Sequence, residues 1–263
     1  MKNPISIFIL DVSNSSNDEM GIELSHYLDQ LVIWISEWTD GIGPIKIKHR
    51  AGDEIIFIGY GYSTAFIIAY YVNWIWKFKQ HKPYFGLSFG DIERELEEID
   101  IEKWIHPLIK QARYANDLIK QESIRTPFKF ELDQFYIHDP LQESFTFHHY
   151  RFEFEQLLNS LLTAQQWLIK EQTDIQEQVY RYYLILQQKK AVAALLGKTA
   201  STISSHFKKG KSEEIHQVFQ EIHRTLHSLQ KKMHQDDQEN LESKELMNSI
   251  QNYLKNHYVK IIS

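Results

Sequence analysis

A basic segment rich in hydroxyl side chains is the part of this sequence best suited to binding chemistry. Residues 189–211 contain six lysines and neither Asp nor Glu, although the chain carries a formal net charge of −6. Attraction to phosphate depends on local charge, so this segment is predicted to bind DNA. Small hydroxyl side chains let a helix lie deep in the major groove while lysines reach the phosphates. The residues expected to contact DNA are Lys198, Thr199, Ser201, Thr202, Ser204, Ser205, Lys208, Lys209 and Lys211.

The spacing in this segment predicts two short helices, 189–196 and 200–209, joined by a tight turn. Ala193 is small enough for close helix crossing, Gly197 suits a positive φ, and Thr199 can cap the second helix. A shared apolar row is expected from Val192, Leu196, Ile203 and Phe207.

This arrangement resembles the helix-turn-helix of many bacterial regulators and of sigma-factor-like domains. Lys198 departs from it, because such motifs usually place an apolar residue after the turn glycine. The proposed reading face has no Arg, Asn or Gln, which predicts little direct base readout and modest specificity. The alternative is a helix pair used only for packing or protein contact.

Two acidic residues in the N-terminal part form a second candidate site. Asp11 ends an apolar run, residues 5–11, and Asp53 belongs to a tight turn between 45–50 and 54–60. Carboxylates at the ends of adjacent strands can hold one or two Mg²⁺ ions against a triphosphate. The alternative is that Asp11 caps a strand end and Asp53 only forms the turn.

Four segments resemble the fold shared by class III nucleotidyl cyclases and GGDEF-type diguanylate cyclases: residues 9–15, 48–54, 84–92 and 107–113. Over residues 5–210 the chain is most similar to the SatD family, which pairs a degenerate cyclase-like region with a C-terminal helix-turn-helix. The resemblance implies that Asp11 and Asp53 bind metal and that Asn14 and Arg113 lie at a nucleotide.

Several residues depart from the cyclase pattern. Asn14 replaces a loop glycine and would crowd a phosphate, and His49 replaces a purine-selecting lysine. Ile105 and His106 replace an acidic residue and a glycine. These departures favour a domain without turnover. Nucleotide or Mg²⁺ binding, or a Mg²⁺-dependent enzyme of the cyclase class, remain as alternatives.

The order of expected elements predicts an α+β fold. Residues 1–145 should form a ferredoxin-like domain. Its elements through residue 91 follow the order βαββαβ, an antiparallel sheet with helices on one face, and a helix at 101–121 and a strand at 128–137 complete it. Residues 150–211 should be helical and include the helix-turn-helix, and residues 212–263 should form a helical hairpin. The expected helices are 151–170, 174–187, 189–196, 200–209, 212–234 and 242–258.

Apolar residues along 212–233 follow heptad spacing, which predicts a homodimer through this helix. They are Ile215, Phe219, Ile222, Leu226, Leu229 and Met233. The alternative is packing on the last helix through Leu246, Ile250, Tyr253 and His257. On the same helix His223 and His227 have the i, i+4 spacing of some zinc sites, but a solvated face is favoured because a third ligand is not evident.

Composition limits the possible functions. The chain has no cysteine, which excludes disulfides and thiol catalysis and fits a cytoplasmic location. The apolar run 65–76 is too short to cross a membrane, so it is predicted to be a buried helix. The leading hypothesis is a DNA-binding transcriptional regulator or accessory protein. A nucleotide-binding enzyme and a protein-interaction module are the alternatives.

Overall fold

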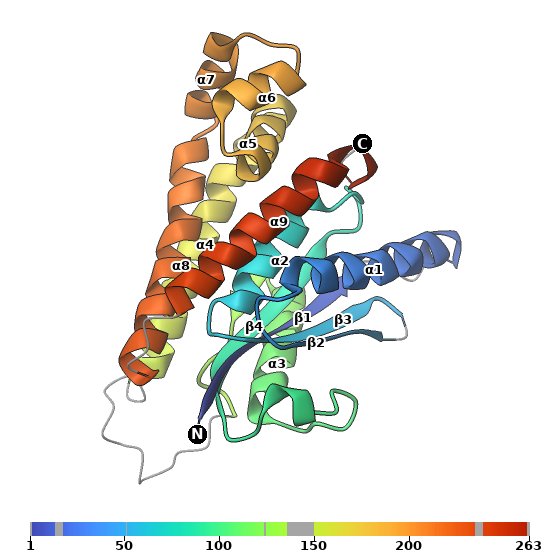
Figure 1. Cartoon of the computed structure of the whole chain (residues 1–263), viewed down its shortest axis with the longest axis vertical. Helices are drawn as coiled ribbons and strands as arrows, with labels where there is room; N and C mark the ends of the chain where they lie inside the picture. Colours follow the sequence, from blue (N-terminus) through green and yellow to red (C-terminus); the bar gives the residue numbers. More distant parts are fainter. Residues whose placement is uncertain are drawn as a thin grey trace.

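The computed structural model describes residues 2–13, 18–50, 52–123, 125–135, 150–234 and 239–261, which form a mixed α and β fold (Figure 1). Its sheet has the strand order β2-β3-β1-β4-β5. β1 is antiparallel to β3 and β4, β2 is antiparallel to β3, and β5 is parallel to β4. The strands are β1 (Asn3–Val12), β2 (Ile45–Arg50), β3 (Glu54–Tyr60), β4 (Pro83–Ile92) and β5 (Phe128–Phe130).

Helices occupy most of the rest of the described chain. They are α1 (Asp18–Thr39), α2 (Thr64–Ile75), α3 (Pro107–Gln121), α4 (Arg151–Lys170), α5 (Asp174–Leu186), α6 (Lys189–Leu195), α7 (Ala200–Lys209), α8 (Ser212–His234) and α9 (Glu239–Ile261). Through β4 the elements follow each other as β1-α1-β2-β3-α2-β4, which is the expected order.

Two elements differ by six or more residues at one end from the prediction, and α9 extends three residues beyond each end of the helix expected at 242–258. The helix expected at 101–121 begins only at Pro107, because His106 is extended, with φ −137° and ψ 147°, as the residue before a proline usually is. The strand expected at 128–137 has only three residues, Phe128–Phe130. It pairs with β4 over three residues, whereas β4 pairs with β1 along its whole length.

The sheet is covered on both faces. On β1, Phe8, Leu10 and Val12 belong to the core that includes α1 and α2. Ile7 and its neighbours of the same parity face the opposite way, toward Leu108 and Ala112 of α3. The expected one-sided cover therefore holds for the helices before β4, whereas α3 lies on the other face.

Helix α3 lies very close to β4 because Gly86 has no side chain. A Cβ atom there would lie 1.9 Å from the Ala112 carbonyl oxygen and 2.6 Å from the Asn116 backbone nitrogen. The buried Asn116 amide donates to the Ile9 carbonyl at 2.9 Å. These contacts hold α3 across β1 and β4. They thereby place Arg113 and Lys120 of α3 near the strand ends.

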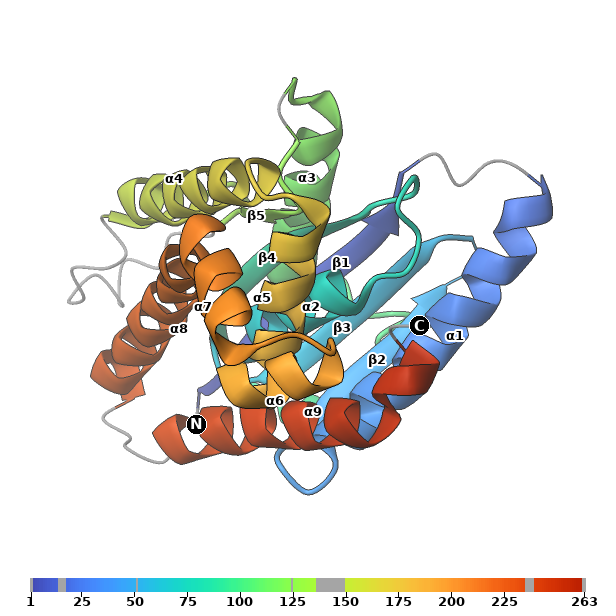
Figure 2. The same cartoon turned by 90° about the horizontal axis from the view of Figure 1, so that it is seen from above.

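Helix α2 is enclosed on all sides, which explains its apolar sequence. The Tyr70 ring stacks on Phe219 of α8 with centroids 4.2 Å apart. The Gln251 amide of α9 donates to the Tyr71 hydroxyl at 2.8 Å. Helix α9 contacts α2 and also packs beside α1 and α5 (Figure 2). Across the described residues, no helix combines the length and apolar character needed to cross a membrane.

The heptad row on α8 is buried within a single chain. Ile215, Ile222 and Leu226 are each 0% exposed, and Phe219 packs on α2. These residues pack within the chain, but α8 lies mainly against α4 and less against α9, the helix that the sequence offered as its intrachain partner. In this arrangement the row is not available to a second copy.

Two buried glutamates join the end of β5 to α4. The Glu155 carboxylate accepts the Leu132 N–H at 2.8 Å, and Glu131 accepts the Gln134 N–H at 2.7 Å. Burial, with the nearby Glu131 charge, raises the pKa of Glu155 to about 7. Since this folded-state pKa exceeds the ordinary value of 4.5, folding favours the protonated form.

The free energy of unfolding should therefore fall as the pH rises through about 7, by up to about 3 kcal/mol relative to acidic conditions. Glu155→Gln keeps an acceptor for Leu132 but carries no charge, so its stability should exceed that of the wild type at about pH 8 and match it more closely near pH 5. Urea unfolding at both pH values measures this difference, with exposed Glu153→Gln as control. An equal pH dependence in the wild type and in Glu155→Gln would contradict the assignment.

Candidate functional site

The basic segment forms a three-helix unit made of α5, α6 and α7, which pack on one another. Gly197 has a φ of +60° in the turn, as its position predicted. The Thr199 hydroxyl accepts the Thr202 N–H at 3.1 Å and caps α7. Ile203 is 0% and Phe207 2% exposed, so the inner side of α7 is fixed against its neighbours.

An aromatic contact and a cation hold the base of α7. The Phe207 ring meets Tyr183 of α5 edge to face at 4.6 Å. The Lys189 ammonium lies 4.0 Å from the centre of the same ring. The Lys189 side chain thus covers the Phe207 ring, and its ammonium charge lies beside α7.

The outer side of α7 is exposed and lies at the end of the molecule away from the sheet (Figure 1). Thr202 is half-buried, whereas the remaining residues expected to contact DNA are exposed: Lys198, Thr199, Ser201, Ser204, Ser205, Lys208, Lys209 and Lys211. The structure therefore brings the predicted residues together on one accessible surface, which we call the α7 face.

The lysines of the α7 face differ in their partners. The Lys211 ammonium lies 2.8 Å from the Glu171 carboxylate, which raises the pKa of Lys211. Lys198, Lys208 and Lys209 form no ion pair with another described residue. Phosphate would therefore meet three uncompensated cations, whereas Lys211 would first have to leave Glu171.

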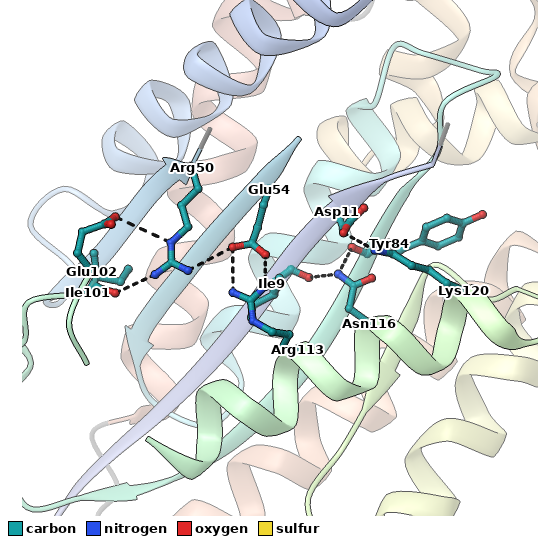
Figure 3. Close-up of polar contacts among 10 residues, drawn as sticks. All are labelled: Ile9, Asp11, Arg50, Glu54, Tyr84, Ile101, Glu102, Arg113, Asn116 and Lys120. Carbon is teal, nitrogen blue, oxygen red and sulfur yellow. Dashed lines mark hydrogen bonds and ion pairs between the residues drawn. The ribbon is translucent and has the colours of Figure 1, made fainter. Parts of the chain in front are cut away.

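The second candidate site lies where β1 and β3 approach α3 (Figure 3). The Asp11 carboxylate at the end of β1 lies 2.5 Å from the Lys120 ammonium. Burial raises the pKa of Asp11, against the lowering effect of Lys120, and the charges of Asp53 and Glu54 raise it further. The acidic residues expected to share a site are therefore near one another, but a lysine faces one of them.

A second basic residue of α3, Arg113, forms an ion pair with the neighbouring carboxylate of Glu54. The Arg113 guanidinium donates to both oxygens of Glu54, at 2.5 and 3.0 Å (Figure 3). Arg50 adds a third donor to Glu54 at 3.4 Å. This bidentate pair raises the pKa of Arg113 and directs its guanidinium toward β3.

In the present arrangement α3 pairs with Asp11 and Glu54, so a Mg²⁺–triphosphate site here stays a prediction that requires these ion pairs to open. Among the described residues, no group of three or more His, Asp or Glu side chains could hold a metal ion. A cation at Asp11 would have to displace Lys120, and a nucleotide at Arg113 would have to displace Glu54. Asn14 lies outside the described residues. The ion pairs between α3 and the strands were not apparent in the sequence, because their members are 59 and 109 positions apart.

Comparisons with protein-family models, curated proteins and solved structures find no match to this chain.

Proposed function

We propose that this chain is a DNA-binding transcriptional regulator or DNA-binding accessory protein that places α7 in the major groove. The observation that carries the proposal is the α7 face, where exposed hydroxyl side chains are flanked by Lys198, Lys208 and Lys209. The capped helix, the positive-φ turn glycine and the buried inner side give α7 the rigidity that a recognition helix needs.

The chemistry of the α7 face favours phosphate contacts over base contacts. Lysine ammonium groups bind phosphate oxygens irrespective of sequence, whereas Ser201, Ser204 and Ser205 can form only single hydrogen bonds with base edges. We therefore propose binding with strong salt dependence and modest sequence preference. A dimer on palindromic DNA would need a surface other than the buried α8 row.

We propose further that the N-terminal part is a ferredoxin-like domain without turnover. The alternating order of strands and helices and the antiparallel pairing of β1 with β3 and β4 support this fold. The engagement of Asp11 and Glu54 by α3 supports the absence of cyclase chemistry. The likeness to the SatD family stays a prediction from the motifs.

A salt series tests DNA binding directly. The affinity of the purified protein for duplex DNA containing its own upstream sequence is measured by gel shift or anisotropy at several salt concentrations. Three phosphate contacts predict a slope of log affinity against log salt of about −2.7. A scrambled duplex should give a similar slope with slightly weaker binding. Failure to bind any duplex at low salt would contradict the proposal.

A further inference from the structure

A cleft of about 660 Å³ lies between α8 and α9, and its lining includes no residue of the α7 face or of the acidic site. Its size is within the range of small-molecule sites in proteins. Tyr71 of α2 and Gln187, which caps the end of α5, also line it. The described lining contains three histidines, an arginine, a lysine and several amides, but no acidic side chain.

One histidine of the lining has a buried ring nitrogen without a partner among the described residues. The His223 Nε2 atom is buried and has no hydrogen-bond partner among the described residues. Burial, together with the positive charges of His227, Arg224 and Lys244, lowers the pKa of His223 to about 4. His223 is therefore more buried than the solvated helix face favoured by the sequence. A buried polar atom of this kind normally has a partner.

The charges around His223 are incompletely balanced within the cleft. Arg224 forms an ion pair with Glu221 at 2.6 Å, and both side chains are largely exposed on α8. Lys244 of α9 is exposed and forms no ion pair with another described residue. The surroundings of His223 thus favour a negative charge.

Other residues of the lining are apolar or aromatic. Phe219 and Met247 contribute to the cleft, and Phe219 is fixed by its stacking on Tyr70. The amide of Gln251 is held by its hydrogen bond to Tyr71. The cleft therefore offers a rigid apolar floor beside cationic and hydrogen-bonding groups, which is the usual composition of a site for an organic ligand.

We propose that the α8–α9 cleft binds a small organic anion, with its phosphate or carboxylate group near His223, Arg224 and Lys244 and its apolar part against Phe219 and Met247. A metal ion is disfavoured, because no described group of three suitable side chains could hold one. The site is separate from the DNA-binding proposal and does not depend on it.

Calorimetric titration with phenyl phosphate tests the site, since this probe joins an anionic group to an aromatic ring. It should bind at least about tenfold more tightly than inorganic phosphate or phenol, each of which offers only half of the required chemistry. Equal affinity for phenyl phosphate and inorganic phosphate would overturn the apolar half of the proposal. Absence of phenyl phosphate binding at millimolar concentration would overturn the whole.

Variants locate the binding. Arg224→Gln/Lys244→Gln should weaken phenyl phosphate binding by about tenfold or more, because two charge-assisted hydrogen bonds are lost. Lys79→Gln/Lys232→Gln removes the same net charge from exposed positions outside the cleft and should leave the affinity unchanged. Equal weakening by the two pairs would show a general charge effect and contradict the site.

The His223 imidazole gives a direct readout by nuclear magnetic resonance. Bound anion should raise the pKa of His223 from about 4, because it favours the imidazolium against the charges of His227, Arg224 and Lys244. Unchanged His223 titration at saturating phenyl phosphate would overturn the placement. Displacement of phenyl phosphate by duplex DNA would identify the cleft as a nucleic-acid phosphate site and contradict a small-molecule ligand. Failure of DNA binding alone leaves these results unaffected.

Discussion

Replacing Lys198, Lys208 and Lys209 together by glutamine is expected to weaken binding to any duplex DNA by on the order of a hundredfold at moderate salt. These lysines are exposed and unpaired with other described residues, so each can release a counterion from the DNA. The slope of log affinity against log salt should become less negative by about 2.7, about 0.9 for each lost phosphate contact. Fluorescence anisotropy over a salt series measures both effects.

Matched variants separate this effect from a loss of fold or of general charge. Lys79→Gln/Lys232→Gln should reduce affinity only slightly, since neither lysine belongs to the α7 face. Ser201→Ala and Ser205→Ala should change sequence preference while keeping the salt slope, because they remove no charge. If the triple lysine variant binds as tightly as the wild type, α7 is not the DNA-binding element.

Gly86→Ala is expected to lower the free energy of unfolding by roughly 4 kcal/mol or more. The new methyl group would overlap the Ala112 carbonyl oxygen and the Asn116 backbone nitrogen, and neither atom can rotate away. Helix α3 would have to move from β4. Its hydrogen bond from Asn116 to Ile9 would be lost with the close packing.

Gly21→Ala is the matched control for this prediction. Gly21 lies in α1, and a Cβ atom there would have no neighbour within 4 Å. The same chemical change should stabilise the protein by about 0.5–1 kcal/mol, because alanine favours the helix. Urea unfolding followed by circular dichroism measures both variants. A Gly86→Ala protein with wild-type stability would show that α3 does not contact β4 this closely.

The elements with strong periodicity could be predicted from the sequence, including their bounds. β2 and β3 have the expected limits, as do α4, α7 and α8, because alternation or helical spacing continues to each end. The start of α3 was misplaced because apolar residues before Pro107 continue the helical spacing, whereas the proline requires an extended residue in front of it.

In the candidate sites, too, local features could be predicted from the sequence, whereas contacts between distant elements could not. Gly197 and Thr199 could be recognised because a turn and a helix cap are local features. The pairing of Lys120 with Asp11 depends on the placement of α3 across the sheet, which local patterns do not encode. The burial of His223 likewise depends on α9, and its own helix shows only an i, i+4 histidine pair.

The enclosure of α2 has a consequence for the time at which this protein can fold during synthesis. Tyr71 is hydrogen-bonded to Gln251, 180 residues later in the chain, and Ser63 is hydrogen-bonded to Ser243 at the same separation. The ribosome must therefore release most of the chain before α2 loses contact with water. Such non-local pairing slows folding and leaves a nascent apolar helix in need of protection from aggregation.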